Sequence, residues 1–232
     1  MELKKWSELP DEMRTKEVRK YYNILAKKGA WFKAKRFLDI IVSFIMLVVL
    51  ALPMVVIAIM IKLDSKGPVF FRQERITQYG RTFNIFKFRT MVVNASELGS
   101  QVTVDNDNRI TRVGKLLRRL RMDEFPQLFN ILAGDMTLVG TRPEVKKYVD
   151  QYTPEMYATL LLPAGITSES SIRYKDEDKL LDIATDIDKV YVEKILVDKM
   201  KFNLESINNY SFLEEILTML RTVFAVLGKE YE

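Results

Sequence analysis

The chain of 232 residues is long enough for one domain, or for one domain with a membrane element, and its 48% hydrophobic and 29% charged residues argue against global disorder. It contains no cysteine and no histidine, which excludes disulfides, thiolate metal sites and cysteine nucleophiles and removes the commonest general base. Acid-base or metal chemistry must therefore use carboxylates, lysine, arginine or tyrosine.

The formal net charge is +5, and the excess lies at the beginning of the chain. Residues 1–36 contain eleven Lys and Arg against five Asp and Glu. A basic stretch followed directly by an apolar run favours attraction to anionic lipid headgroups over binding to nucleic acid. We expect residues 1–34 to form a basic prefix, helical from Glu12 to Lys28. It does not read as a signal peptide, because the apolar run begins too late and no small-residue cleavage site follows it.

The next segment is strongly apolar. Residues 40–61 are 22 consecutive residues without a charge, enough for a straight helix of about 33 Å that crosses the bilayer core. Pro53 argues against a simple crossing, because proline removes a helix hydrogen bond and kinks the axis. Both flanks are basic, with Lys33, Lys35, Arg36, Lys62, Lys66, Arg72 and Arg75. Since the positive-inside rule places both ends on the cytoplasmic face, we expect a membrane helix over 35–63, broken at Pro53, that enters one leaflet and returns. An ordinary anchor with a proline kink is the alternative.

After Asp64 the pattern predicts short strands and turns, followed by helices. The expected extended elements are a turn at 66–68, a strand at 69–71, a hairpin turn at 79–81, a strand at 83–88 and a polar loop at 95–110. The expected helices cover 111–120, 123–132, 144–160, 186–200 and 212–227. The last has apolar residues at helical spacing, and its apolar face fits a protein core or a membrane surface equally well. Together these elements predict an α+β chain that is predominantly helical.

The densest group of charged residues lies between Arg118 and Pro143. Asp123 and Glu124 open a predicted helix, and Pro126 falls in its first turn, where proline is tolerated. The unpaired amides of a helix N-terminus suit carboxylates and also attract phosphate. Because adjacent helical residues point about 100° apart, the two carboxylates would not act as a symmetric pair. One would attack or bind a metal, while the other positions a proton or the ion.

Basic residues surround this pair. Arg118, Arg119 and Arg121 come immediately before it, and Arg142 follows on a proline-fixed loop. Lys87 and Arg89 alternate along a predicted strand, so we expect them to share a face and line the same pocket. Arginines around carboxylates and a hard cation are what a diphosphate substrate needs. Helix capping and solvated surface charge are the ordinary alternatives, and the residues alone leave them open.

A basic lead and an interrupted apolar segment are followed by GPVFFRQERI, FKFRTM, RMDEFPQLFNILAGDMTLVGTRPE and LPAGIT. The chain resembles the monotopic phosphoglycosyl transferases in the order of these motifs. This is the bacterial sugar transferase family of capsule, exopolysaccharide, O-antigen and glycoprotein assembly. The resemblance runs from about Lys35 to about Leu227 and is most specific over 123–143. It implies a re-entrant membrane helix, interfacial amphipathic helices and a small mixed active-site domain within a catalytic domain over 64–232. It also implies a place in the bacterial inner membrane with the active site facing the cytoplasm.

The resemblance further implies a reaction. Asp123 matches the family's nucleophile, which attacks the β-phosphorus of a UDP-sugar, releases UMP and forms a phosphosugar-aspartyl intermediate. Polyprenyl (undecaprenyl) phosphate then accepts the phosphosugar from this intermediate. Glu124 matches the second carboxylate, which helps to position the reacting groups and Mg²⁺. The implied site consists of Asp123 and Glu124 as catalytic and metal-binding residues, with Arg142, Arg118, Lys87, Arg89 and Pro143 as substrate-binding residues.

Three departures from the family pattern leave the substrate open. Leu52 precedes Pro53 where relatives usually have serine, and Thr141 replaces the first proline of the Pro-Arg-Pro loop. Residues 168–174 replace the Gly-x-Ala-Gln form common among relatives. The sugar, the pathway, the role of residues 1–30 and the oligomeric state, a homodimer included, stay open. A catalytically silent membrane scaffold is the alternative from another class, and the intact carboxylate pair and Arg142 count against it.

Overall fold

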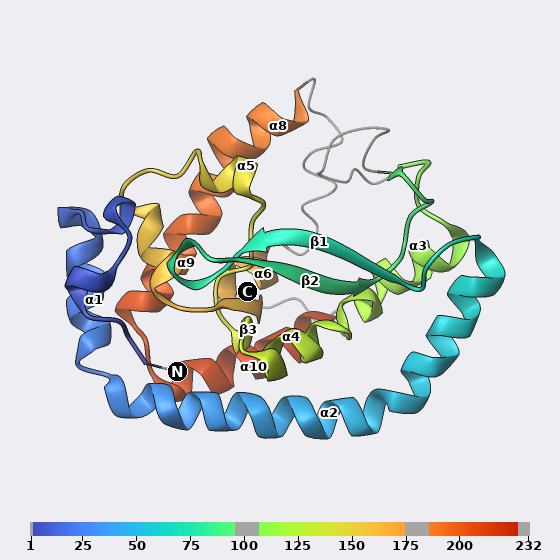
Figure 1. Ribbon diagram of the computed structural model, residues 1–232, viewed down its shortest axis with the longest axis horizontal. Coiled ribbons are helices and arrows are strands. Elements are labelled where there is room, and N and C mark those ends of the chain that lie inside the picture. Colours follow the sequence, from blue (N-terminus) through green and yellow to red (C-terminus); the bar gives the residue numbers. More distant parts are fainter. Residues whose placement is uncertain (1, 96–106, 175–185, 227–232) are drawn as a thin grey trace.

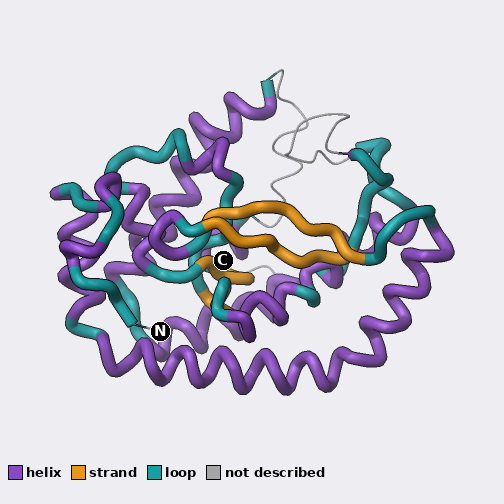
Figure 2. Tube along the Cα trace, in the orientation of Figure 1, coloured by secondary structure: helices purple, strands orange, loops and turns teal. Residues whose placement is uncertain are grey.

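The computed structural model describes residues 2–95, 107–174 and 186–226. Figures 1 and 2 show a long helix along one edge and a compact body of shorter helices and strands packed on it. The helical elements are η1 (Trp6–Glu8), η2 (Asp11–Met13), α1 (Lys16–Ala26), α2 (Gly29–Asp64), η3 (Gln78–Gly80), α3 (Arg112–Arg119), η5 (Met122–Glu124), α4 (Gln127–Ala133), α5 (Lys146–Val149), η6 (Met156–Leu161), α6 (Glu169–Arg173), α8 (Ile187–Val190), the π-helical turn η7 (Tyr191–Leu196), α9 (Val197–Asn208) and α10 (Phe212–Val226). The strands are β1 (Phe70–Ile76), β2 (Thr82–Phe88), β3 (Met136–Val139) and β4 (Ala164–Thr167).

Helix α2 contains the predicted membrane segment. It is one helix of 36 residues with Pro53 inside it, and it bends upward toward α3 in Figure 1. The expected break at Pro53 is thus a bend within a continuous helix, because a proline removes only one hydrogen bond of the ladder. By length and composition α2 is able to cross a membrane, and only 17% of its most apolar window is buried. Most of its outward side chains are apolar, among them Phe37, Phe44, Ile45, Val48, Val49, Leu52, Val55, Val56, Ile59 and Leu63.

Both ends of α2 are bound to the same body. Near its start, Arg36 donates to the carbonyl oxygens of Ile131 and Leu132 at the end of α4, at 2.5 and 3.0 Å. At its last residue, Asp64 accepts a 3.0 Å hydrogen bond from the backbone N–H of Val113 in the first turn of α3. The helix therefore lies along the body and does not project from it.

The strands form two separate pairs. β1 and β2 are an antiparallel hairpin, and its turn has left-handed backbone at Tyr79 (φ 59°) and Gly80 (φ 74°), which confirms the predicted turn. β3 and β4 form a parallel pair that the sequence did not predict, because four-residue strands are too short to show a period. Asn130 of α4 fixes this helix to β2 of the hairpin: its side chain accepts from the N–H of Phe86 (2.9 Å) and donates to the carbonyl oxygen of Asn84 (2.8 Å).

The N-terminal prefix is not set apart from the rest of the chain. Val18 and Leu25 of α1 are fully buried in the same apolar cluster as Leu161 of η6 and Leu196 of η7. The charged residues of the prefix lie on its outer side, which is why composition alone suggested a polar appendage. The expected boundary at residue 34 thus falls inside α2 and not between two structural units.

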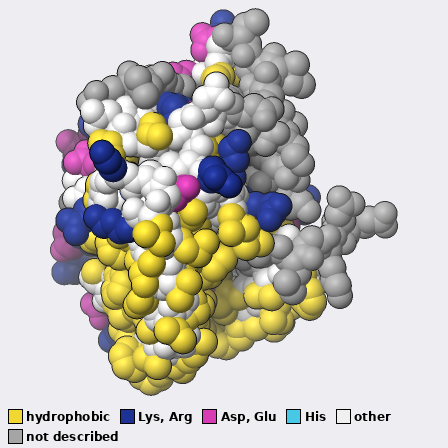
Figure 3. Space-filling model, turned by 90° about the vertical axis from the view of Figure 1, so that its right-hand side faces the viewer, with side chains coloured by type: hydrophobic (Ala, Val, Ile, Leu, Met, Phe, Trp, Pro, Cys, Tyr) yellow, Lys and Arg dark blue, Asp and Glu magenta, His cyan; other side chains and the backbone are white. Residues whose placement is uncertain are grey.

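Helix α10 has its polar side inward. Glu215 and Thr218 are buried, whereas Leu213, Leu220 and Val223 are more than half exposed. A core helix would show the opposite arrangement. Figure 3 shows that apolar side chains gather over the lower part of the molecule, with Lys and Arg above them. The outward apolar sides of α2 and α10 are therefore unpaired within the described part of the chain.

Candidate active site

The Asp123–Glu124 pair lies in a short turn between two helices. Thr111 caps α3, accepting a 3.0 Å hydrogen bond from the N–H of Gly114. At the other end of α3 the backbone of Arg121 is left-handed, with φ 55°. This conformation, uncommon for a residue with a side chain, reverses the chain just before the pair. As a result the two carboxylates point inward, and each residue is only 9% exposed.

Two cations hold Glu124. Lys87 of β2 donates to its Oε1 at 3.0 Å, and the Arg142 guanidinium contacts both carboxylate oxygens, with Nη1 at 3.3 Å from Oε2. Burial opposes the ionisation of Glu124, but Arg142 and Lys87 outweigh it and hold the pKa of Glu124 well below its usual value. Burial also lowers the pKa of Lys87, although Glu124 opposes that shift. Glu124 is therefore a charged anchor whose oxygens are already engaged.

Asp123 is in a different state from its neighbour. No hydrogen bond to its side chain is found among the described residues. Burial, helped by the charge of Glu124, raises the pKa of Asp123 above its usual value, while Lys87, Arg118 and Arg142 oppose the rise. A buried carboxylate with cations nearby and no committed partner suits attack on an electrophile, because the attacking oxygen is not masked by a hydrogen bond.

The loop that carries Arg142 is fixed by backbone contacts. The N–H of Gly165 donates to the carbonyl oxygen of Thr141 at 2.8 Å, and the N–H of Gly140 donates to Thr167 at 2.9 Å. Arg75 of β1 donates to the carbonyl oxygen of Pro143 at 3.2 Å. The parallel strand pair and β1 together hold the loop so that Arg142 reaches Glu124.

The other predicted site residues divide into two groups. Arg118 is oriented by Thr90, whose hydroxyl accepts from its Nε at 2.9 Å, and it acts electrostatically on Asp123. Arg89 does not meet Lys87 in one pocket: β2 ends at Phe88, so the alternation stops there. Its guanidinium donates to the carbonyl oxygens of Ser65 and Lys66, at 2.9 and 2.5 Å.

Pro143 is buried, and it shapes the loop beside Arg142. Arg75, which the sequence marked only as a flanking charge, is the residue that supports this loop from β1. Its partner is a backbone carbonyl oxygen, so no spacing signal in the sequence pointed to it. Substrate contacts of Arg89 and Pro143 stay predictions.

The donor set can be compared with the expected Mg²⁺. Among the residues that the structure describes, no group of three or more Asp or Glu side chains is arranged so that it could hold a metal ion. Mg²⁺ in phosphoryl-transfer sites is usually held by one or two carboxylates together with substrate phosphates, so a small donor set fits. Asp123 offers such a carboxylate. Glu124, the other predicted ligand, has both oxygens in contact with cations.

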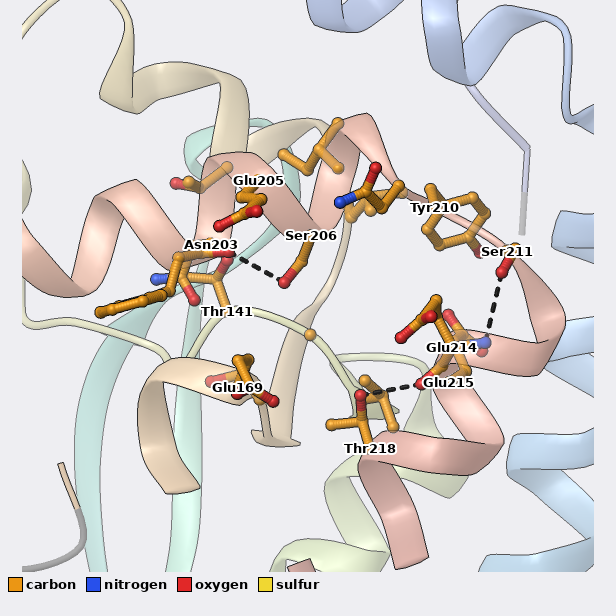
Figure 4. Close-up of a pocket in the computed structure, with 18 of the residues that line it drawn as sticks. Thr141, Glu169, Asn203, Glu205, Ser206, Tyr210, Ser211, Glu214, Glu215 and Thr218 are labelled. Atoms are coloured by element: carbon orange, nitrogen blue, oxygen red, sulfur yellow. Dashed lines mark hydrogen bonds between the residues drawn. The ribbon is translucent and has the colours of Figure 1, made fainter. Parts of the chain in front are cut away.

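A cavity of about 250 Å³ opens on the other side of the Arg142 loop. Figure 4 shows Thr141 and Glu169 facing Asn203, Glu205 and Ser206 of α9 across this space. α10 closes a further side with Glu214, Glu215 and Thr218. The segment that departs from the family form begins beside this cavity. Ser168 directly follows β4, and residues 169–173 form α6. The sequence indicated this segment but not the cavity, which depends on contacts between distant elements.

Comparison with known proteins adds independent information. Residues 30–229 match the sequence model of a protein family that is described as bacterial sugar transferase. The chain is 36% identical over 197 residues to UDP-N-acetylgalactosamine-undecaprenyl-phosphate N-acetylgalactosaminephosphotransferase of Aeromonas hydrophila, covering 83% of this chain and 43% of that protein. It is 32% identical to galactosyl transferase CpsE of Streptococcus agalactiae, covering 89% of this chain and 45% of that protein.

It is also 33% identical to UDP-glucose:undecaprenyl-phosphate glucose-1-phosphate transferase of Escherichia coli, covering 82% of this chain and 39% of that protein. The chain thus spans less than half the length of these three relatives.

Proposed function

Because this chain belongs to the bacterial sugar transferase family, we propose that it transfers a sugar-1-phosphate from a UDP-sugar to polyprenyl (undecaprenyl) phosphate and releases UMP. The names of the Aeromonas hydrophila and Escherichia coli relatives support the reaction class. The observation that carries the proposal for this chain is the unequal carboxylate pair: Glu124 is held by Lys87 and Arg142, whereas Asp123 has no hydrogen-bond partner in the described ranges. The reaction would be the first membrane step of glycoconjugate assembly.

The reaction proceeds in two displacements at phosphorus. An Asp123 carboxylate oxygen bonds to the β-phosphorus of the UDP-sugar, the bond from that phosphorus to the bridging oxygen breaks, and UMP leaves with the electron pair. A phosphate oxygen of the polyprenyl phosphate then bonds to the same phosphorus and returns the electron pair to Asp123. The covalent intermediate divides a transfer between two anions into two separate steps.

The surrounding cations serve both displacements. Arg118, Lys87 and Arg142 lie where they offset the negative charge that would otherwise repel the attacking carboxylate. Glu124 keeps Lys87 and Arg142 in place, so it acts as a positioning residue for the cations. Asp123 and the substrate's phosphate oxygens would hold Mg²⁺, which supplies further charge neutralisation at the diphosphate.

We also propose that the protein sits in one leaflet of the bacterial inner membrane, with the site on the cytoplasmic side. Both ends of α2 are bound to the body through Arg36 and Asp64, which supports a helix that enters and returns from one side. The outward apolar side chains of α2 and α10 would contact lipid. In this arrangement a soluble UDP-sugar and a lipid phosphate meet at the membrane surface.

Substitution of the nucleophile tests the proposal. Asp123→Asn should reduce UMP release, measured in nanodiscs with polyprenyl phosphate, by at least about a thousandfold. Asp135→Asn is the matched control, because Asp135 is paired with Arg81 outside the site. Incubation with a UDP-sugar labelled in the sugar, without lipid acceptor, should leave covalent label on the wild-type protein and none on Asp123→Asn. An unlabelled wild-type protein that releases no UMP with any donor would support the silent scaffold instead.

A further inference from the structure

A buried ionic group lies behind the Arg142 loop. Its centre is the carboxylate of Glu144, two residues after Arg142. The hydroxyl group of Tyr191 in η7 donates to Oε1 of this carboxylate at 2.7 Å, and Nζ of Lys199 in α9 lies 3.8 Å from the same oxygen and 3.4 Å from the Tyr191 hydroxyl oxygen. On the other side, Nη1 of Arg75 in β1 lies 3.9 Å from Oε2. The group therefore joins η7 and α9 to β1 beside the loop.

Stability alone does not account for this group. Glu144, Tyr191 and Lys199 are each less than a tenth exposed, and Tyr191 belongs to the apolar cluster around Leu161. An ion pair taken out of water gains little, and apolar residues of similar volume are often at least as stable in its place. What such a group can supply is one fixed arrangement of the elements that it joins. Tyr191 also begins η7, and π-helical turns are rare and frequently lie at functional sites.

Glu144 is coupled to Arg142 through the backbone. Pro143 lies between them, and because its ring fixes φ, a displacement of Glu144 is transmitted to Arg142. The backbone N–H of Ile76 donates to the carbonyl oxygen of Glu144 at 2.9 Å, and Arg75 donates to that of Pro143 at 3.2 Å. The loop is thus held to β1 by its backbone and to η7 and α9 by the Glu144 side chain.

The charge of Glu144 also matters, because Arg75 and Arg142 carry like charges. Burial lowers the pKa of Arg75 below its usual value, Glu144 opposes this shift, and Arg142 adds to it. The Glu144 carboxylate therefore offsets a repulsion that would otherwise push the Arg142 loop away from β1. Tyr191 and Lys199 keep the carboxylate in the position where it does so.

We propose that Tyr191 and Lys199 are positioning residues for the transfer reaction: by holding Glu144 they keep the loop where Arg142 reaches Glu124. This inference rests on the proposed function and deepens it. Neither residue touches a substrate in this proposal, and both act on the site through Arg142.

Removal of one hydroxyl group tests the inference. Tyr191→Phe keeps the ring that packs on Tyr148, with the ring centroids 4.7 Å apart, and loses the hydrogen bond to Glu144. We expect kcat/KM for the UDP-sugar to fall about tenfold, because a displaced Arg142 no longer holds its contacts. Tyr148→Phe is the matched control, because the Tyr148 hydroxyl donates to Asp188 at 2.6 Å, and its kcat/KM should stay within about twofold of wild type. Equal kcat/KM values of the two variants would overturn the inference.

A double-mutant cycle separates positioning from a general structural effect. In an Arg142→Lys background the contact that Tyr191 maintains is already broken, so Tyr191→Phe should lower kcat/KM by less than about threefold. A residue that only stabilises the fold would lower kcat/KM by the same factor in both backgrounds. That additive result would overturn the inference, even if the single variant is as impaired as expected.

A second variant addresses Lys199. Lys199→Met removes the charge and keeps an unbranched side chain, and kcat/KM should fall about fivefold or more. Lys201→Met is the control, because Lys201 lies on the same helix with an exposed side chain and pairs with Asp198. A Lys199→Met protein with the melting temperature and kcat/KM of the wild type would remove Lys199 from the proposal. Failure of the wild-type protein to turn over any UDP-sugar would instead refute the proposed function itself.

Discussion

Gly140 and Gly165 lie in direct backbone contact where the two parallel strands meet. A Cβ at Gly165 would collide with the backbone nitrogen, carbon and oxygen of Gly140, and one at Gly140 would lie 2.7 Å from the carbonyl oxygen of Pro163. Neither neighbour is a flexible side chain that could move aside. The contact brings the end of β3 against β4 and thereby fixes the loop that carries Arg142.

Gly165→Ala tests this contact. The added methyl group should push the Gly140–Arg142 loop away from β4, so that Arg142 loses its contacts with Glu124 and UMP release falls at least about tenfold. The melting temperature should also fall. Gly29→Ala is the control, because a Cβ at Gly29, in the first turn of α2, meets nothing within 4 Å. An active Gly165→Ala protein would show that the loop is held by other contacts.

Arg142→Lys tests the two-oxygen contact with Glu124. A lysine keeps the charge but contacts only one oxygen, so we expect kcat/KM to fall about ten- to a hundredfold while the protein stays folded. Arg81→Lys is a matched control, because Arg81, which is half exposed, forms a pair with Asp135 2.8 Å away that lies outside the site. Equal activity of the two variants would mean that charge alone, and not geometry, is required at Arg142.

Leu25→Ala tests whether the N-terminal prefix belongs to the core. Leu25 is 0% exposed among η6 and η7, so the cavity left behind should lower the free energy of unfolding by about 2–5 kcal/mol. Asn23→Ala, on the exposed side of the same helix, should change it by less than about 0.5 kcal/mol. Thermal unfolding in detergent measures both. A Leu25→Ala protein as stable as the wild type would make the prefix a separate appendage after all.

Glu215→Gln gives a pH-dependent prediction. Burial, only partly offset by Lys35, raises the pKa of Glu215 above its usual value. The folded state therefore keeps the proton that the unfolded state releases, and the wild-type contribution of this group falls as the pH rises from the unfolded pKa, about 4.3, toward the folded pKa. The free energy of unfolding of Glu215→Gln should accordingly rise relative to wild type between pH 4 and pH 7. A constant difference across this range would mean that Glu215 is not perturbed by its surroundings.

Much of the fold follows from local signals in the sequence. The uncharged run around Pro53, the hairpin turn at Tyr79 and Gly80 and the short helix predicted over 111–120 all depend on residues close in sequence, and the structure contains each of them. The Asp123–Glu124 pair and Arg142 were also predicted, from motif and charge. The contact between Lys87 and Glu124 joins two elements that are distant in sequence. The family resemblance implied this contact, whereas local sequence patterns did not show it.

Other features depend on partners that are far apart in the chain. The parallel pairing of β3 with β4 and the burial of α1 require contacts that no local period reveals. Arg89 was predicted to share a face with Lys87, but β2 ends at Phe88. Its guanidinium instead donates to the carbonyl oxygens of Ser65 and Lys66, which follow α2. The sequence of α10 did not show which side faces the protein; in the structure the buried side carries Glu215 and Thr218, and Glu215 is paired with Lys35 of α2.

The pairing of Lys35 and Asp39 bears on the timing of biogenesis. Lys35 is bonded to Glu215 in the last helix, and Asp39 accepts from Thr137 at 2.6 Å and from the N–H of Leu138 at 3.2 Å. Within α2 the two charges lie 3.9 Å apart, and their remaining partners come from β3 and α10, which follow about a hundred residues or more later in the chain. The buried ionic group at this end of α2 is therefore complete only once the chain has been made as far as Glu215, so the longest helix depends on one of the last for its final surroundings.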